Sequence, residues 1–392
     1  MTFARHSCGG CGSRDLITFL DLGSSPLADA FPASPDEPEV RYPLRVAYCG
    51  ECFLAQLIDV VPDNALYGAD YGFYTGASPS SRGYFAEYAE WVRTWFPTLR
   101  EGLAVEVASN DGTLLRLLQH DARKVVGVEP AAGVARVAQD AGLEVLVEPF
   151  GREAAAKIVS SHGYADLIIA NNVVAHVSDL HDFLGGISAL LRMDGRAIIE
   201  FQYVADLLTG NQFDHVYHEH RFFFSRASLS RVMERHGLVV RSQHETPAQG
   251  GSLRVVVGKG AGQRHAVLPG EKWLTRPAAY LGMQGRVDYI RTRLLDILGD
   301  ELDAGRRVAG FAASAKSTTL LNYCRIGTDY LFAVEDKTPY KIGRYTPGTH
   351  IPIVEHAEAD TYLLMAWNYL SGVLRREPDR RFIVPIPQPV IL

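Results

Sequence analysis

Short apolar runs and helical stretches alternate through the middle of the chain. From about residue 103, the runs "LAVEV", "KVVGV", "LEVLV", "ADLIIA" and "RAIIEF" are separated by segments in which apolar residues recur with helical spacing. Strands and helices that alternate in this way form a doubly wound parallel sheet with right-handed crossovers. The next two strand-like segments, "LVVRSQHET" and "GGSLRVVVGKG", have only a short turn between them, which predicts an antiparallel hairpin at the edge of the sheet.

Two further units flank this sheet. The N-terminal segment contains connections such as "DLGSSPLADAF" and "VPDNALYG", which predict a loop-rich module with few strands. The last part of the chain returns to alternating strands and helices, with "RVAGFAA", "YLFAVED", "YLLMAW" and "RFIVPIP" as strand-like runs. The expected architecture is therefore α/β in three domains, at residues 1–75, 76–262 and 263–392.

The composition excludes several classes of protein. The 392 residues are 47% apolar, which suffices for ordinary globular cores, and the net charge is −6. The chain has no basic stripe of the kind that binds nucleic acid, and it has no run of about 18 apolar residues that could span a membrane. The first residues, "MTFARHSCGGCG", lack the apolar core of a secretory signal. We therefore expect a soluble cytoplasmic protein that binds neither nucleic acid nor membrane, with a monomer favoured.

Four of the five cysteines form two Cys-x2-Cys pairs. Cys8 and Cys11 make the first pair, and Cys49 and Cys52 make the second. Each pair can present two thiolates to one ion, so the two pairs together predict a tetrahedral zinc site. Four thiolates leave no open coordination position, which makes the zinc structural rather than catalytic. The glycines of "CGGCG" and "CGEC" stand where tight knuckles need them, and Cys324 lies apart in an apolar segment.

The ends of three predicted strands carry residues suited to an adenosine-containing cofactor. After the first strand, "EVASNDG" provides small side chains that let backbone N–H groups approach a ligand. The second strand ends at Glu129, whose carboxylate can accept hydrogen bonds from both ribose hydroxyls, and the fourth ends in Asn171 and Asn172, over the cofactor position. Because a G-x-G-x-x-G motif is absent and a closing hairpin is expected, S-adenosylmethionine (SAM) is favoured over NAD. The predicted cofactor-binding residues are Ala108, Ser109, Asn110, Gly112, Glu129, Asn171 and Asn172.

The sequence "NQFDHVYHEHRFFFS", residues 211–225 and hereafter the histidine segment, follows the fifth strand. Its titratable side chains are Asp214, His215, His218, Glu219 and His220. Histidines at this spacing could bind a metal ion, adjacent His and Glu side chains suit general-base catalysis, and a polar structural loop is the third interpretation. The spacing leaves all three open, with acid–base chemistry favoured. Upstream, the local pattern around His176 is more typical of the start of a helix than of a catalytic residue.

The last unit carries a candidate anion site. The segment "GFAASAKSTTLLNY" predicts a strand, a small-residue loop and a helix, so backbone N–H groups and the helix N-terminus could hold an anion, with Lys316 supplying charge. The spacing of a Walker A motif is missing. The loop "PYKIGRYTPGTH" adds Lys341, Arg344 and His350, for which a solvated basic loop is the alternative.

Taken together, these segments resemble the SAM-dependent C-methyltransferases that act on nucleotide-linked 4-keto deoxysugars and make the branched sugars of antibiotic biosynthesis. The resemblance extends over nearly the whole chain. It is carried by the paired Cys-x2-Cys module, "SNDGTLL", "NNVVAHV", "YHEHRFFFS", "GGSLRV", "AKSTTLLNY", "PYKIGRYTPGTHIPI" and "LLMAWNY".

The resemblance implies roles for individual residues. In similar enzymes the Tyr, Glu and second His of "YHEH" line the active site, which implies Tyr217 and Glu219 as site residues and His220 as the base. His176 and a tyrosine after the zinc module, Tyr71, are implied to lie near the sugar. The C-terminal domain is implied to help bind the nucleotide diphosphate. The predicted substrate-binding residues are Lys316, Lys341 and Arg344.

Two positions depart from the family pattern. The cofactor turn of the family usually reads "GSNDG", and here Ala108 replaces the first glycine. One methyl group is tolerated there if φ at Ala108 is negative, so we expect cofactor binding to be retained. The loop before Lys316 usually begins Gly-Ala, whereas this chain has "FAASAKST", which weakens the assignment of the diphosphate contact.

The expected reaction is methyl transfer from SAM to the carbon beside the ketone, C3 above all, of a dTDP-4-keto-deoxysugar. Removal of the C–H proton next to C=O gives an enolate, so the site needs a base, His220, and a donor to the oxyanion, Tyr217 or His176. Methylation at C5 or of a non-sugar ketone is one alternative. Another is a non-catalytic zinc-binding module with a decayed methyltransferase domain, which only Ala108 supports.

Overall fold

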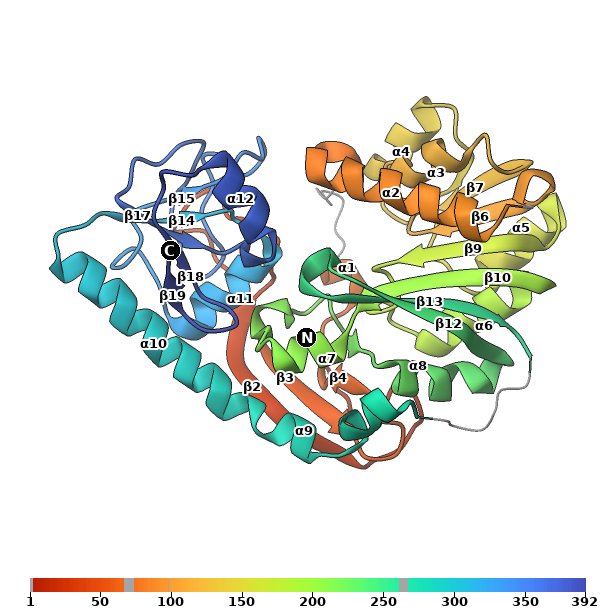
Figure 1. Ribbon diagram of the computed structural model, residues 1–392, viewed down its shortest axis with the longest axis horizontal. Coiled ribbons are helices and arrows are strands. Elements are labelled where there is room, and N and C mark those ends of the chain that lie inside the picture. The colour runs from red at the N-terminus through yellow and green to blue at the C-terminus, as the bar shows by residue number, and fades with distance from the viewer. Residues whose placement is uncertain (1–2, 67–73, 98, 261–266) are drawn as a thin grey trace.

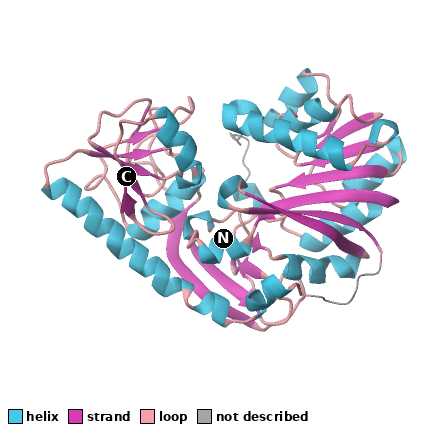
Figure 2. Cartoon of the chain, in the orientation of Figure 1, coloured by secondary structure: helices cyan, strands magenta, loops and turns pink. Residues whose placement is uncertain are grey.

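The computed structural model describes residues 3–66, 74–97, 99–260 and 267–392. Figure 1 shows a large α/β unit and a smaller C-terminal α/β unit, with an antiparallel sheet of N-terminal residues (red and orange) between them at the bottom of the view. Figure 2 separates the helices and strands of the same view by colour. Within the described ranges, no helix is both long enough and apolar enough to cross a membrane.

Seven strands form the central sheet, in the order β12-β13-β10-β9-β6-β7-β8. Their bounds are β6 (Leu103–Val107), β7 (Lys124–Val128), β8 (Val145–Leu146), β9 (Ala165–Asn171), β10 (Leu191–Gln202), β12 (Leu238–Thr246) and β13 (Ser252–Lys259). The five strands from β10 to β8 are parallel, whereas β13 pairs antiparallel with both β10 and β12. The prediction of a doubly wound sheet closed by an antiparallel hairpin is confirmed. The strand order reverses between β6 and β9, and ligands of such sheets bind beyond the carboxyl ends of the strands at this point.

Helices cover both faces of the central sheet. Those of this unit are α2 (Pro79–Trp95), α3 (Thr113–Leu118), α4 (Ala132–Asp140), α5 (Arg152–His162), α6 (Leu180–Leu190), α7 (Val204–Thr209) and α8 (Arg226–Met233). One apolar cluster joins α2, α3 and α4 to the sheet, and a second, larger cluster includes α5, α6 and α8. In Figure 1, α2 lies along the upper face of the sheet, near its ligand-binding edge.

The N-terminal residues form more strand than their sequence predicts. Strands β2 (Leu16–Pro26), β3 (Arg41–Cys49), β4 (Ala55–Leu57) and β11 (Phe222–Phe223) make one antiparallel sheet. The expected loop "DLGSSP" is therefore wrong, because it continues β2. An irregularity in the β2–β3 pairing between Asp21 and Ser24 contains Gly23 at φ +75°, so a bulge accommodates turn-forming residues within a long strand.

Strand β11 ties the histidine segment to the N-terminal sheet. Phe222 and Phe223 pair with Gln56 and Ala55 of β4. One strand of this sheet thus comes from the central part of the chain, so the N-terminal residues alone do not complete it. Two short elements complete this region: β1 (Phe3–Ala4) pairs with β5 (Asp59–Val60), and α1 (Asp63–Leu66) follows.

The C-terminal unit is a second, smaller α/β layer structure, as predicted. Its sheet has the order β16-β15-β14-β17-β18-β19, parallel except for β19. The bounds are β14 (Val308–Phe311), β15 (Val334–Glu335), β16 (Ile353–Val354), β17 (Thr361–Leu364), β18 (Phe382–Val384) and β19 (Val390–Ile391), with helices α9 (Ala278–Leu281), α10 (Met283–Asp303), α11 (Ala315–Cys324) and α12 (Leu370–Arg376). The order reverses between β14 and β17, so the loops after these strands form the expected ligand edge of this sheet.

Candidate active site and zinc centre

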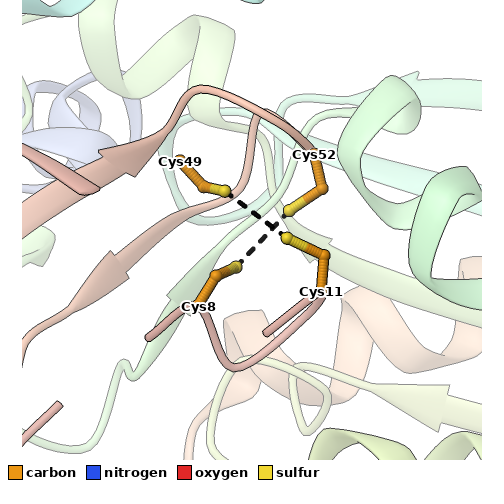
Figure 3. A group of neighbouring side chains, drawn as sticks. All are labelled: Cys8, Cys11, Cys49 and Cys52. Carbon is orange, nitrogen blue, oxygen red and sulfur yellow. Dashed lines mark hydrogen bonds between the residues drawn. The ribbon is translucent and has the colours of Figure 1, made fainter. Parts of the chain in front are cut away.

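Four cysteine sulfurs converge in the N-terminal unit (Figure 3). The sulfurs of Cys8, Cys11, Cys49 and Cys52 all lie within 4.8 Å of one another. Cys8 and Cys52 are 3.4 Å apart and Cys11 and Cys49 are 3.6 Å apart, measured between Sγ atoms. Zinc–sulfur bonds of about 2.3 Å in a tetrahedron place the sulfurs about 3.8 Å apart, so the four side chains fit one zinc ion.

Neighbouring polar groups stabilise these thiolates. The Cys8 sulfur accepts hydrogen bonds from the Gln56 amide (3.1 Å) and from the Gly10 N–H (3.3 Å). The side-chain oxygen of Gln56, Oε1, in turn accepts from the Gly9 N–H at 2.8 Å. Such partners offset thiolate charge and fix the orientation of metal ligands.

The predicted glycine knuckles are only partly correct. In the first knuckle Gly12 has φ +79°, but in the second the left-handed residue is Phe53, at φ +67°. Phe53 stacks on Tyr48 and lies beneath the Arg231 guanidinium, 4.2 Å from its ring centre, and this packing compensates for the unfavourable φ. Gly50 has no positive φ, and a Cβ there would meet only the carboxylate of the exposed Asp15, 1.9 Å away, which could turn aside.

The turn after β6 is a strained backbone loop. Positive φ occurs at Ala108 (+55°), Asn110 (+52°) and Gly112 (+74°). The expectation of retained cofactor binding assumed a negative φ at Ala108, and this assumption is wrong. The chain turns sharply at Ala108, which lets the Ser109 N–H donate to the Val128 carbonyl (3.2 Å). Glycine is obligatory at position 112, since a Cβ would also lie 2.5 Å from Leu143. Ala108 occupies a conformation that costs about 1 kcal/mol for a residue with a Cβ.

Glu129, predicted to accept ribose hydroxyls, lies at the end of β7. It is buried directly after β7, where its two carboxylate oxygens accept the N–H groups of Asn110 (3.0 Å) and Ala131 (2.8 Å). Each oxygen keeps a second lone pair for a hydroxyl donor. Burial raises the pKa of Glu129, and the two backbone N–H groups oppose that shift by stabilising the charged form.

The two asparagines predicted at the fourth strand end lie at the same edge. Asn171 is the last residue of β9 and pairs with Glu200 of β10. Asn172 has φ +51°, and its N–H donates to the Glu200 carbonyl at 2.8 Å. The turn after β6, Glu129 and these amides therefore line neighbouring strand ends, as a SAM site requires.

One acidic residue at this edge was not among the predicted site residues. Glu106 of β6 is buried, and its Oε2 atom has no hydrogen-bond partner among the described residues. Burial raises the pKa of Glu106 well above its usual range, with Asp111 adding to the shift. The signal in the sequence was an acid within an apolar strand, which implies a buried carboxyl group.

The histidine segment turns back on itself beside this edge. Asp214 and His215 are buried in a short 3-10 turn (Phe213–His215), and the His220 N–H then donates to the Tyr217 carbonyl at 2.9 Å. An extended strand would point Tyr217 and His220 to opposite faces. The turn brings their side chains together, with 2.8 Å between Tyr217 Oη and His220 Nε2.

The hydrogen bonds of His220 define its protonation. Its Nδ1 lies 2.7 Å from the His215 carbonyl oxygen, which can only accept, so Nδ1 carries the proton. Nε2 therefore holds a lone pair and accepts from the Tyr217 hydroxyl. Burial lowers the pKa of His220 to about 4, the bond to His215 opposes that shift, and the charge of Lys316 adds to it. His220 is thus a neutral acceptor near pH 7.

His176 lies against His220. Their ring centres are 4.8 Å apart at an interplanar angle of 84°. The Arg221 N–H fixes this contact by donating to the Ala175 carbonyl at 2.8 Å. Burial, followed by the charges of His220 and Arg221, lowers the pKa of His176 well below its usual value. Tyr71, the other residue expected near the sugar, lies outside the described residues.

The interpretation of His176 as the start of a helix is wrong. Helix α6 begins later, at Leu180. Its N-cap is Asp179, whose carboxylate accepts the N–H groups of His181 and Asp182, both at 2.9 Å. Because a carboxylate caps a helix far better than an imidazole does, the helix starts there and leaves His176 in the loop above the sheet.

Glu219 and His218 of the histidine segment lie in different surroundings. Burial raises the pKa of Glu219 to about 8, with Asp29 adding to the shift. His218 has a structural role, because its Nε2 faces the carbonyl oxygens of Tyr42 (3.3 Å) and Pro43 (3.2 Å). In the part of the chain that the structure describes, the four cysteines are the only group of three or more potential metal ligands, so the histidines of the segment are not gathered around a common point as three ligands would be.

The C-terminal unit packs directly on the histidine segment. The Trp367 indole N–H donates to Asp214 at 2.6 Å, and the Thr319 hydroxyl donates to the Val216 carbonyl at 2.9 Å. Lys316 is buried here and donates to Asn368. Burial lowers the pKa of Lys316 to about 8 and raises that of Asp214 to about 6, while their mutual attraction opposes both shifts.

The predicted basic loop is fastened to its surroundings. Lys341 donates to the Ala313 carbonyl (2.7 Å), in the loop that precedes α11 and Lys316. Arg344 donates to the Phe31 carbonyl (3.0 Å), which joins the loop to the N-terminal unit. Arg344 nevertheless remains exposed to solvent. The structure brings Lys341 to the ligand edge of the C-terminal sheet and engages Arg344 in a contact between units.

Comparisons with known proteins agree with this arrangement. Residues 8–67 match a zinc binding domain, residues 81–243 a methyltransferase domain, and residues 247–387 a C-methyltransferase C-terminal domain. C-methyltransferase NovU from Streptomyces niveus is 32% identical over 406 residues, which cover 98% of this chain and 96% of NovU.

Solved structures are similar over about half of the chain. The PH0226 protein from Pyrococcus horikoshii OT3 has 15% identity, covers 48% of this chain and 97% of its own, and gives a TM-score of 0.40. Magnesium protoporphyrin IX methyltransferase from Synechocystis PCC 6803, solved with bound SAM, has 14% identity, covers 46% of this chain and 79% of its own, and gives a TM-score of 0.34.

The sheet order and the ligand edge after β6 and β7 define a SAM-dependent methyltransferase. The identity to NovU over nearly the whole of both chains shows that this chain belongs to the C-methyltransferase family. SAM is its methyl donor, and the four N-terminal cysteines bind a structural zinc ion.

Substitution of a zinc ligand is expected to unfold the N-terminal sheet. Cys52→Ser should lose bound zinc and lower the melting temperature, because the two knuckles hold the ends of β2, β3 and β4 together. Cys324→Ala, in the buried face of α11, serves as the matched control and should keep the metal. Metal analysis with thermal unfolding measures both effects, and full zinc content in Cys52→Ser would contradict the assignment.

Replacing Ala108 by glycine should relieve backbone strain. Ala108→Gly is expected to raise the unfolding free energy by up to about 1 kcal/mol, reduced by the entropy cost of glycine in the unfolded chain. Ala104→Gly, in the regular part of β6, should instead lower it. Chemical denaturation compares the two variants, and an equal loss of stability in both would show that position 108 carries no strain.

Proposed function

We propose that this enzyme methylates the carbon next to the ketone of a nucleotide-linked 4-keto deoxysugar, with His220 as the base. The observation that carries the proposal is the neutral imidazole of His220. Its Nδ1–H is fixed on the His215 carbonyl and its Nε2 lone pair is directed toward Tyr217, in a buried loop beside the SAM edge. Such a group can accept a proton at neutral pH without first losing one.

The ketone makes the chemistry feasible. His220 Nε2 takes the proton from the carbon next to C=O, and the electrons of that C–H bond form an enolate. SAM supplies a methyl group on a sulfonium. The enolate carbon forms the new C–C bond as the C–S bond breaks with its electrons going to sulfur, so the leaving group is a neutral thioether that needs no general acid. The chain must therefore provide a base, an oxyanion donor and alignment.

Tyr217 is suited to stabilise the enolate. Its hydroxyl donates to His220 Nε2 in the free site. Nε2 has a single lone pair, so the Tyr217 O–H must turn from Nε2 to the ketone oxygen as the substrate binds. Nε2 can then take the proton while Tyr217 donates to the developing enolate oxygen. His176, 4.8 Å from His220 between ring centres, is the second candidate donor.

The nucleotide part of the substrate is assigned to the C-terminal unit. Lys316 lies at the start of α11, where the backbone N–H groups of the helix and the buried ammonium favour an anion such as a diphosphate. The pKa of Glu219, raised to about 8, keeps its carboxyl protonated at neutral pH and able to donate to a sugar oxygen. We assign dTDP as the nucleotide and C3 as the methylated carbon, on the family resemblance, with the three domains dividing near residues 75 and 262.

Loss of the base should abolish turnover and leave SAM binding intact. His220→Asn is expected to lower kcat by about 10²-fold or more, because asparagine cannot accept the proton. His218→Asn is the matched control, because the wild-type His218 imidazole faces the backbone carbonyls of Tyr42 and Pro43. That variant should lose stability and keep most of its turnover. Calorimetric SAM titration accompanies the rates, and wild-type turnover in His220→Asn would remove this residue from the base role.

The substrate assignment is tested with a panel of acceptors. Incubation with SAM and several dTDP-4-keto deoxysugars should give products heavier by one methyl group, with NMR placing it on C3. Corresponding 4-hydroxy sugars are the matched control and should not react, because they cannot form an enolate. Methylation of a 4-hydroxy sugar would contradict the mechanism, and a product methylated at C5 would contradict the position. Absence of SAM binding would favour a decayed methyltransferase domain.

A further inference from the structure

A buried ion pair lies beside the SAM edge of the central sheet. Glu200 of β10 and Arg254 of β13 are cross-strand partners, 0% and 5% exposed. Arg254 Nε donates to Glu200 Oε2 at 2.8 Å. Burying two charges costs more free energy than packing apolar side chains in the same space. Stability alone therefore does not explain this ion pair.

Helix α2 rests on this pair through one face. Tyr84, Tyr88 and Trp91 have the spacing of successive turns. The Tyr84 hydroxyl donates to Glu200, and Arg254 Nη2 lies 3.2 Å from the same hydroxyl. The Arg254 guanidinium carbon is 3.8 Å from the Tyr88 ring centre and 4.6 Å from that of Trp91. The ion pair therefore fixes how α2 lies over the sheet.

The beginning of α2 contacts the turn after β6. In the residues that precede the helix, the Thr75 N–H donates to Asn110 Oδ1 at 2.7 Å, and the Gly76 N–H donates to Asp111 Oδ2 at 2.8 Å. A shift of α2 would therefore also move this turn. Figure 1 shows α2 (orange) running across the central sheet.

Glu200 links the elements that surround the cofactor edge. Its backbone carbonyl accepts the Asn172 N–H at 2.8 Å, while its side chain holds α2. One residue thereby connects the fourth strand end to the helix, and the helix connects to the turn of the first strand.

We propose that Glu200 and Arg254 are positioning residues of the SAM site. They set the distance between the turn after β6 and the amides of Asn171 and Asn172 by locking α2 over the sheet. The proposal rests on the cofactor residues assigned above, and it is independent of the base and of the sugar substrate.

Tyr84→Phe is the most selective test, because it removes one hydrogen bond to a buried charge and keeps the ring. The dissociation constant for SAM, measured by calorimetry without acceptor, should rise about tenfold. Turnover at saturating SAM should stay within about twofold of wild type, since the reacting groups are untouched. Glu200→Gln should raise the same constant further, because it leaves the Arg254 charge unpaired.

Arg192→Gln is the matched control on the same strand. Arg192 forms an exposed ion pair with Asp166 at 2.8 Å, at the far end of β10 from Glu200. Its loss should leave SAM binding unchanged. An unchanged SAM dissociation constant in Tyr84→Phe would overturn the proposal, as would a lower melting temperature with no change in SAM affinity. Should Glu200→Gln not fold, Tyr84→Phe alone decides the outcome.

Discussion

The site depends above all on removal of the histidine segment from water. Three units surround it: β4 of the N-terminal sheet pairs with Phe222 and Phe223, the loop after β9 bonds Arg221 through the Ala175 carbonyl, and the C-terminal unit covers it through Trp367. Each contact is short and directional, so the turn has little freedom. Desolvation then lowers the pKa of His220, and the carbonyl of His215 selects the nitrogen that carries its proton.

The zinc site and the second α/β unit both bear on the histidine segment. The zinc ligands lie at the ends of β2, β3 and β4, so they shape the sheet to which β11 is added. The C-terminal unit brings Lys316 and Asp214 together in a buried environment. Both outer units thus contact the same segment of the central one.

Much of the architecture could be predicted because it depends on local patterns. Alternating apolar runs predicted a doubly wound parallel sheet closed by an antiparallel hairpin, and two Cys-x2-Cys pairs predicted the zinc site. The bulge at Gly23 could not be predicted, because turn-forming residues look the same in a loop and in a bulged strand. The positive φ of Ala108 and the pairing of Glu200 with Arg254 depend on backbone geometry and register. The burial of Lys316 depends on how two units pack, which no local pattern records.

Nitrogen-15 NMR of labelled histidine tests the central claim most directly. With the His220→Asn variant used to assign the signal, His220 of the wild-type enzyme should appear near pH 6 as a neutral imidazole protonated on Nδ1. Its signal should not titrate until the pH approaches its lowered pKa of about 4. A His220 side chain that is protonated on both nitrogens at pH 6, or neutral with the proton on Nε2, would contradict its role as the base.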